Sequence, residues 1–228
     1  LELQDRETPL NAFLAELEKD LPALAGSITD VSGILTDFEV GLADATGEQT
    51  TYNQLGQPCT EYTVIFARGT TEPGNVGIVA GPPFFNALDS IVGSSSVTIQ
   101  GVNNYAASVE GYLEGGDPTG SKEMASLISE AVTNCPNTNL IVSGYSQGGQ
   151  LVHNSISELP AATAKAIDSV VIFGDPYAGV PIPNVPSSKV LTICHLGDDI
   201  CIDGDLVLPP HLTYGLNAVQ AADFVTRG

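Results

Sequence analysis

The chain has little positive charge and no long apolar run. It carries 7 Lys and Arg residues against 27 Asp and Glu residues, and its formal net charge is −20. Because this charge repels polyanions, it excludes nucleic acid as an electrostatic partner and favours an uncharged ligand. No run approaches the roughly 20 apolar residues that a membrane-spanning helix needs. The composition therefore predicts neither a nucleic-acid partner nor a membrane span.

The sequence also lacks CxxC pairs and clusters of Cys and His, the patterns typical of metal sites. Its four cysteines are Cys59, Cys135, Cys194 and Cys201. The even number fits two disulfides in an oxidising compartment. Cys194 and Cys201 flank a short acidic loop, which leaves Cys59 and Cys135 as the second pair. We therefore expect a secreted protein without a bound metal.

The chain starts at Leu1 with neither Met nor a basic segment, so we expect that a signal peptide was removed. No NxS/T acceptor is present, which predicts no N-glycosylation. With 228 residues and 43% hydrophobic content, the chain can bury one sizeable core. The prediction is one domain with an extension.

From about residue 58 to 226, apolar β-branched runs alternate with helical patterns, which is typical of a parallel sheet covered by helices. Five strands are predicted, at Tyr62–Arg68, Val97–Val102, Asn139–Gly144, Ser169–Gly174 and Val190–His195. Helices are predicted near 78–92, 121–134, 147–158, 161–166 and 216–226. The sequence thus predicts an α/β fold whose ligand binds at the carboxyl edge of a five-stranded parallel sheet.

Residues 1–57 have a different pattern. Apolar residues recur every three or four positions, first at Leu10, Phe13, Leu14, Leu17, Leu21 and Leu24, then at Ile28, Val31, Leu35, Phe38 and Leu42. Thr8 and Pro9 fit the start of the first helix, and Pro22 and Gly26 place its end nearby. The second stripe lasts until Gly47. We expect two amphipathic helices whose stripes cover another surface.

A candidate nucleophile lies in Gly144-Tyr145-Ser146-Gln147-Gly148, which matches GxSxG. A predicted strand precedes the motif and a predicted helix follows it, as the tight strand-to-helix turn of a nucleophile elbow requires. The glycines permit the turn that exposes the Ser hydroxyl. A chance match in a turn would lack this context, so we interpret Ser146 as a catalytic serine.

A serine hydroxyl needs a base, and in this fold the chain order is Ser, acid, His. His153 precedes every plausible acid loop and is interpreted as a surface or packing residue, and His195 lies at a strand end. His211, in a Pro-Pro-His turn after the last strand, is the expected base. The acid candidates are Asp175, Asp198, Asp199, Asp203 and Asp205. Asp198 and Asp199 lie in the Cys194–Cys201 loop, and spacing alone does not separate them.

The negative charge of a tetrahedral intermediate needs N–H donors. One is expected from Gln147, the residue after the nucleophile, and one from the loop after the first core strand. That loop is Arg68-Gly69-Thr70-Thr71-Glu72, in which Thr70 could supply its backbone N–H and its hydroxyl. A plain turn is the alternative interpretation of the loop.

These residues resemble those of the fungal cutinase family, in ARGTTEPGNVG at 67–77, GYSQGG at 144–149, the Cys194–Cys201 loop with GDD inside it, and LPPHLTYG at 208–215. The similarity extends over roughly 59–226, in order and with matching spacing. It implies a small α/β-hydrolase fold in which 58–228 form the catalytic domain. It also implies Ser146 as nucleophile, Asp198 as acid, His211 as base, Thr70 and Gln147 as oxyanion donors, and the disulfides Cys59–Cys135 and Cys194–Cys201.

The resemblance further implies a secreted monomer without a cofactor that hydrolyses cutin, short-chain esters and some triglycerides through an acyl-enzyme. Transient contact with a lipid or polymer surface is part of this expectation. Val207 and Leu208 fit an apolar rim that contacts the acyl chain. Two other functions stay open: an acetylxylan esterase, which shares the GYSQG elbow, and a non-catalytic wall-binding protein. The apolar 207–210 run and Phe84-Phe85 favour acyl chains, and the retained Ser, Asp and His favour catalysis.

The long N-terminal extension is the main departure from what we expect of this family. It is interpreted as a retained propeptide, a permanent cap or an amphipathic lid over the site. We favour the lid, because an apolar cleft and an unpaired amphipathic helix would each bury the exposed apolar surface of the other.

Overall fold

Five parallel strands form the main sheet, in the order β3-β2-β4-β5-β6. The computed structural model describes residues 9–227. The strands are β2 (Tyr62–Ala67), β3 (Val97–Gly101), β4 (Asn139–Tyr145), β5 (Ser169–Phe173) and β6 (Val190–Ile193). Four of them are buried along most of their length, as their continuous hydrophobicity predicts, and β6 is the partly exposed edge. The predicted α/β fold with a five-stranded parallel sheet is confirmed.

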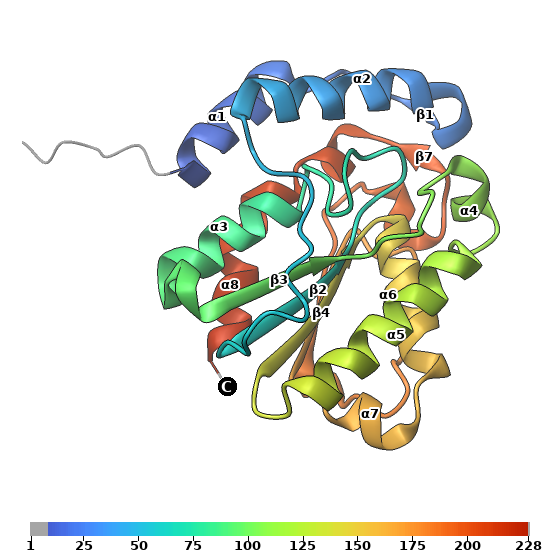
Figure 1. The fold of residues 1–228 in the computed structure, drawn as a ribbon. Coiled ribbons are helices and arrows are strands. Elements are labelled where there is room, and N and C mark those ends of the chain that lie inside the picture. Colours follow the sequence, from blue (N-terminus) through green and yellow to red (C-terminus); the bar gives the residue numbers. More distant parts are fainter. Residues whose placement is uncertain (1–8, 228) are drawn as a thin grey trace, which may run out of the picture.

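Helices cover both faces of this sheet (Figure 1). On one face lie α3 (Gly81–Val92) and α8 (Ala218–Thr226), and on the other α5 (Pro118–Asn134) and α6 (Gln147–Glu158). Two short helices, α4 (Val109–Leu113) and α7 (Ala161–Lys165), lie in the connections. Among the described residues, no helix is both long and apolar enough to span a bilayer.

Local hydrogen bonds explain where the observed helices depart from the predicted ranges. α3 begins at Gly81 and not at 78, because the amides of Ile78 and Val79 donate to the Glu72 carboxylate. α5 begins three residues early because Asp117 caps it, accepting from Gly120 N. α4 was not predicted. It follows Ser108, whose hydroxyl oxygen accepts from Gly111 N.

The N-terminal segment forms α1 (Pro9–Asp20), β1 (Gly26–Ser27) and α2 (Ile28–Thr46). α1 ends before Leu21, because a residue that precedes proline is disfavoured in helical conformation. Thr8, its expected N-cap, lies outside the described residues. Ser27 caps α2 by accepting from Asp30 N, and Gly47 ends it in the left-handed conformation.

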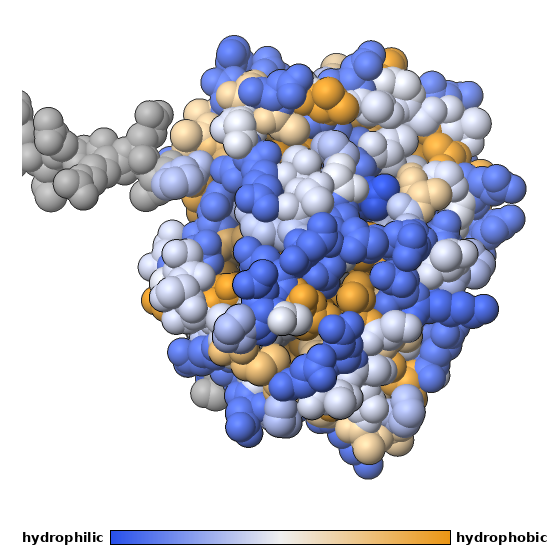
Figure 2. Space-filling model, viewed as in Figure 1, coloured by the Kyte–Doolittle hydropathy of each residue, from blue (hydrophilic) through white to orange (hydrophobic). Residues whose placement is uncertain are grey.

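The apolar stripes of α1 and α2 belong to the same hydrophobic cluster as β2, α3 and α8. β1 pairs with β7 (Leu206–Val207), with Gly26 opposite Val207. α2 crosses the top of the molecule, above β7 and α4 (Figure 1). The face shown in Figure 2 is mainly hydrophilic, with apolar residues in small scattered groups. The division at residue 57 stays a prediction, since the extension is packed into the common core.

Candidate active site

Ser146 lies in a sharp turn between β4 and α6. Its φ is +56°, a conformation rarely adopted by residues other than glycine, and its N–H donates to the Phe173 carbonyl at 3.0 Å. The neighbouring glycines are sterically required: a Cβ on Gly144 would lie 2.4 Å from the Gly148 carbonyl oxygen, and one on Gly148 would lie 2.0 Å from that of Ala67. The GxSxG motif therefore forms the expected elbow, with Ser146 at the carboxyl edge of the sheet.

Three side chains from separate loops meet at this turn. His211 Nε2 lies 2.9 Å from Ser146 Oγ, and His211 Nδ1 lies 2.8 Å from Asp198 Oδ2. Because a carboxylate only accepts, the hydrogen lies on Nδ1 and leaves Nε2 to accept from the serine hydroxyl. The structure thus brings together the three residues that the sequence nominated, and it selects Asp198 over its neighbour Asp199.

Asp198 is held by more donors than the histidine alone. Oδ2 also accepts from the Tyr214 hydroxyl at 2.5 Å, and Oδ1 accepts from Ile200 N at 3.1 Å. Burial by itself raises the pKa of this carboxyl, but the hydrogen bonds and the attraction of His211 outweigh it and hold the pKa below its ordinary value. The carboxylate is therefore kept charged next to the histidine.

Two tyrosines complete the surroundings of His211. The Tyr145 ring stacks on the imidazole with a centroid distance of 5.0 Å, and its hydroxyl donates to the His211 carbonyl at 2.9 Å. Tyr214 meets the imidazole edge-on. Sequence reasoning assigned neither tyrosine a role. The only signal in the sequence was their position, since Tyr145 directly precedes Ser146 and Tyr214 lies within LPPHLTYG.

The other histidines and acids have different partners. His153 Nε2 lies 3.0 Å from Asp175 Oδ2, in a buried pair that joins α6 to the end of β5. The imidazole nitrogens of His195 contact the Pro210 carbonyl and Asn217 Oδ1, and its ring stacks on Tyr214. Neither histidine contacts Ser146 through any described hydrogen bond. His153 packs inside the protein, as one of its two interpretations predicted.

The side chain of Gln147 connects two loops next to the same turn. The Gln147 side-chain nitrogen lies 2.8 Å from Thr70 Oγ1 and 2.8 Å from the Ser108 carbonyl oxygen. The expected oxyanion residues Thr70 and Gln147 are therefore adjacent, joined through a side chain whose role the sequence analysis did not foresee. Both disulfides are formed as expected, Cys59–Cys135 and Cys194–Cys201.

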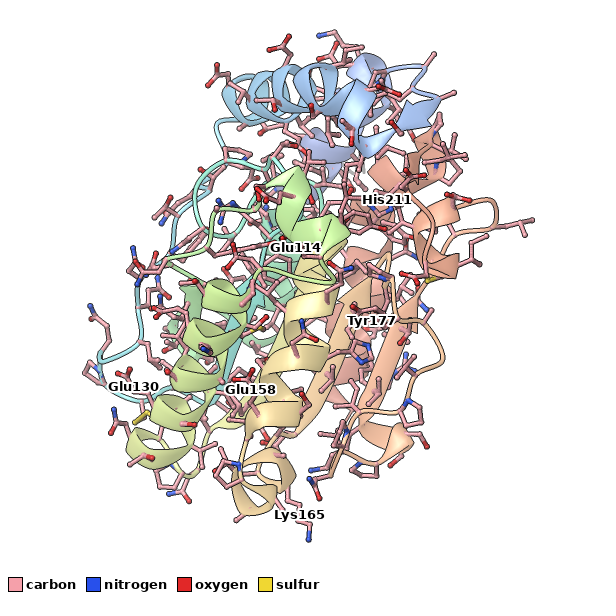
Figure 3. All side chains as sticks on the ribbon, turned by 90° about the vertical axis from the view of Figure 1, so that its right-hand side faces the viewer. Glu114, Glu130, Glu158, Lys165, Tyr177 and His211 are labelled. Carbon is pink, nitrogen blue, oxygen red and sulfur yellow. A yellow bond between two sulfur atoms is a disulfide. The ribbon has the colours of Figure 1, made fainter. Side chains whose placement is uncertain are left out.

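α2 lies over this site. Ser146 is 3% exposed, His211 2% and Asp198 4%, so the three side chains are closed off from solvent. In Figure 3 His211 lies beneath the helical extension. Val207 is buried in β7 against β1, and Leu208, which follows it, is partly buried. Whether either residue contacts an acyl chain stays a prediction.

No group of three or more His, Cys, Asp or Glu side chains that could hold a metal ion occurs within residues 9–227. The fold and the site define a serine carboxylic ester hydrolase. The profile of the cutinase family matches residues 58–228, and the chain belongs to this family.

Individual relatives agree with that assignment. Cutinase pbc1 of Pyrenopeziza brassicae is 52% identical over 197 residues, which cover 86% of this chain and 96% of the relative. A cutinase of Monilinia fructicola is 58% identical over 169 residues, 74% of this chain and 83% of its own. The structure of Trichoderma reesei cutinase in complex with a C11Y4 phosphonate inhibitor has a TM-score of 0.79 and 44% identity, covering 95% of this chain and 97% of that one.

The match to the Trichoderma reesei structure covers 95% of this chain, which is more than residues 58–228 could supply. It therefore extends well into residues 1–57. The extension is therefore shared with a solved cutinase. Our expectation that it departs from the family is wrong in this respect.

Proposed function

We propose that this protein is a secreted cutinase that hydrolyses polyesters and short- to medium-chain esters through an acyl-enzyme on Ser146. The observation that carries the proposal is the continuous chain of hydrogen bonds from Asp198 through His211 to Ser146. Ser146 Oγ attacks the ester carbonyl carbon while His211 Nε2 takes its proton, which then passes to the departing alcohol. Water attacks the acyl-enzyme in the same way and releases the acid. Asp198 stabilises the imidazolium of His211 both during formation of the acyl-enzyme and during its hydrolysis.

The negative charge on the carbonyl oxygen is stabilised by the backbone N–H groups of Gln147 and Thr70 and by the Thr70 hydroxyl. The orientation of that hydroxyl follows from its neighbours. The Ser108 carbonyl can only accept, so the NH₂ group of Gln147 must face it, and the second N–H of that group faces Thr70 Oγ1. Thr70 Oγ1 therefore accepts from Gln147 and its own hydrogen is free for the substrate.

The second part of the proposal assigns α2 the role of a lid. The burial of Ser146 supports it, because a polymer chain cannot reach a serine that is 3% exposed. The apolar residues on the inner face of α2, such as Leu35 and Phe38, belong to the cluster that also holds Tyr145 and Tyr214, which contact His211. Opening would expose this face, and a lipid or polymer surface would cover it again.

Two neighbouring residues on α2 give a matched test of the lid. Leu35 is buried and Ile34 is 54% exposed on the outer face. Leu35→Ala removes buried contacts worth about 2–5 kcal/mol and should raise activity on a soluble ester without detergent, whereas Ile34→Ala should behave as the wild type. Detergent should stimulate the wild type more than Leu35→Ala. The lid is excluded if detergent leaves the wild type unchanged and both variants match it.

The catalytic assignment is tested by covalent labelling. A serine-directed organophosphate should label Ser146 in the presence of detergent, and Ser146→Ala should be neither labelled nor active. An adduct on another residue contradicts the proposal. Hydrolysis of p-nitrophenyl butyrate and cutin, compared with acetate release from acetylated xylan, tests the ester class. The apolar residues Val207 and Leu208 beside the site support acyl chains over sugars.

Secretion is supported by the two disulfides and by the acidic composition, since disulfides persist in oxidising compartments. Non-reducing mass spectrometry of the protein from culture fluid should find both bridges. A protein confined to cell extract with four free thiols would contradict this part of the proposal.

A further inference from the structure

Glu39 is a buried carboxyl group on α2. The helix carries four acidic residues, of which Asp30, Asp37 and Asp44 are exposed and Glu39 is 1% exposed. Glu39 lies one turn after Leu35 on the inner face that covers the site. A carboxyl group in the apolar face of a helix is costly unless it is paired or neutral, so its partners decide what it does.

The partners of Glu39 belong to the oxyanion loop. Thr71 Oγ1 lies 2.8 Å from Glu39 Oε2. Thr71 follows Thr70 directly and has a φ of +69°, an uncommon conformation for a β-branched residue. The contact therefore joins the inner face of α2 to a constrained loop that carries a proposed oxyanion donor.

Within residues 9–227, no cation forms a salt bridge with this carboxyl. The charged and titratable groups that face it come from the body of the protein: Glu72 repels it, Arg68 attracts it, and Tyr145 is a neutral phenol. The Arg68 guanidinium donates to the carbonyls of Glu72 and Tyr105, and none of the described salt bridges includes Glu39.

The number of hydrogens available at the Thr71 hydroxyl indicates the protonation state of Glu39. Thr71 Oγ1 lies 2.5 Å from the Thr70 carbonyl oxygen as well as 2.8 Å from Glu39 Oε2. The hydroxyl has one hydrogen and can donate to only one of these oxygens. Both contacts become hydrogen bonds if Glu39 is protonated, because its O–H then donates to Thr71 Oγ1 while Thr71 donates to the Thr70 carbonyl.

We propose that Glu39 is a proton-dependent latch, which in its neutral form holds α2 closed on the oxyanion loop and on ionisation releases it. This inference rests on the proposed role of α2 as a lid and adds the condition under which the lid opens. The only chemical change in the latch is the loss of one proton from the Glu39 carboxyl to solvent.

The direction of the pH effect follows from the environment. Burial, and then repulsion from Glu72, raise the pKa of Glu39 well above its ordinary value, against the Thr71 hydrogen bond and Arg68. The closed form thus binds the proton more tightly than an open form with an exposed carboxyl. Closure is fully favoured below the ordinary carboxyl pKa and is lost as the pH rises toward the raised pKa of the closed form.

Glu39→Gln tests the latch because it keeps the shape and a donor while removing the charge. Asp37→Asn, on the exposed face of the same helix, is the matched control. The measurement is the ratio of activity on a soluble ester without and with detergent across the pH range, because the ratio isolates the opening of the lid from pH effects on the catalytic step. In the wild type and Asp37→Asn the ratio should rise by up to about tenfold per pH unit over the window. In Glu39→Gln it should stay low and flat.

Thermal unfolding gives a second measurement that does not depend on activity. Glu39→Gln should raise the melting temperature at slightly alkaline pH, where it keeps the closed form that ionisation of Glu39 weakens, and the difference should vanish in acid. The latch is overturned if Glu39→Gln shows the wild-type activity ratio at every pH. It is also overturned if the difference in melting temperature between Glu39→Gln and the wild type is the same in acid and in alkali. In that case an intact detergent effect and an active Leu35→Ala variant would still support the lid, whereas their absence would overturn the lid itself.

Discussion

Tyr214 and His211 donate to the same oxygen atom, Oδ2 of Asp198, at 2.5 Å and 2.8 Å. The aspartate therefore does not depend on the histidine alone for its orientation. While the imidazole changes its charge during catalysis, the phenol keeps one bond to the carboxylate constant. This relationship makes Tyr214 a positioning residue for the acid of the proposed triad.

Tyr214→Phe should lower stability in a pH-dependent way. The pKa of Asp198 is below its ordinary value, so the stability that Asp198 contributes is present above the ordinary pKa and is lost as the pH falls through the lowered one. We expect a loss of about 1.5–3 kcal/mol near neutral pH, as for a hydrogen bond to a charged group. In the wild type the backbone N–H of His195 also donates to the Tyr214 oxygen. In acid, the loss of stability should therefore shrink to the cost of leaving this one N–H without its partner. Urea unfolding at the two pH values measures this, and an equal loss at both would indicate packing alone.

Thr70→Val should lower kcat by about a hundred- to a thousandfold, because it removes a side-chain donor to the oxyanion, with little change in KM. Thr70→Ser should retain most of the rate. Gln147→Leu keeps the backbone N–H but removes the group that orients the Thr70 hydroxyl, so it should reduce kcat in the wild type and change nothing further in the Thr70→Val background.

Gln150→Leu is the control for this cycle, since Gln150 is another buried glutamine on α6 and donates to the Tyr112 carbonyl and not to Thr70. Its effect should be the same in both backgrounds. Additive losses for Gln147→Leu and Thr70→Val, measured by steady-state kinetics, would exclude the orienting role.

The two disulfides should differ in their effect on catalysis. Replacing Cys194 and Cys201 with serine should cost about 2–3 kcal/mol from the chain-entropy model and also lower kcat, because Asp198 lies within the loop that they close. Replacing Cys59 and Cys135, which lie outside the triad loops, should lower stability but leave kcat of the folded protein unchanged. Equal kcat in both variants would show that the bridge does not restrain Asp198.

The two buried histidine–aspartate pairs give opposite predictions. His211→Gln should lower kcat by about 10⁴- to 10⁶-fold. His153→Gln should instead reduce the free energy of unfolding by about 1.5–3 kcal/mol, because His153 bonds the buried Asp175, and the folded fraction should keep its kcat. Melting curves and kinetics on the same samples separate the two. Comparable losses of kcat would mean that the His153 pair also takes part in the reaction.

The sheet and the elbow could be predicted because their signals are local. Continuous β-branched runs mark buried parallel strands, and GxSxG encodes its own turn in two glycines with no room for a Cβ. The chain order of serine, acid and histidine indicated His211 as the base, and the family resemblance indicated Asp198 as the acid. Asp198 and Asp199 could not be separated by spacing, because the distinction depends on which side of a 3-10 turn faces His211.

Contacts between distant segments were not predictable from pattern. Tyr214, the Gln147 side chain and the Glu39 to Thr71 contact depend on loops that come together only in the folded chain. The helical periodicity of 28–42 predicted an amphipathic α2 but not what it covers. A glutamate in that stripe looks like an ordinary solvated residue until its burial is known.

The inner face of α2 and the catalytic body share one hydrophobic core, so opening the proposed lid means separating parts of that core. Whatever replaces the lid has to offer a comparable continuous apolar area. A single dissolved ester molecule is too small to do so, whereas a film or an aggregate is not. The enzyme would then select its substrates first by their physical state and only afterwards by the chemistry of the ester bond.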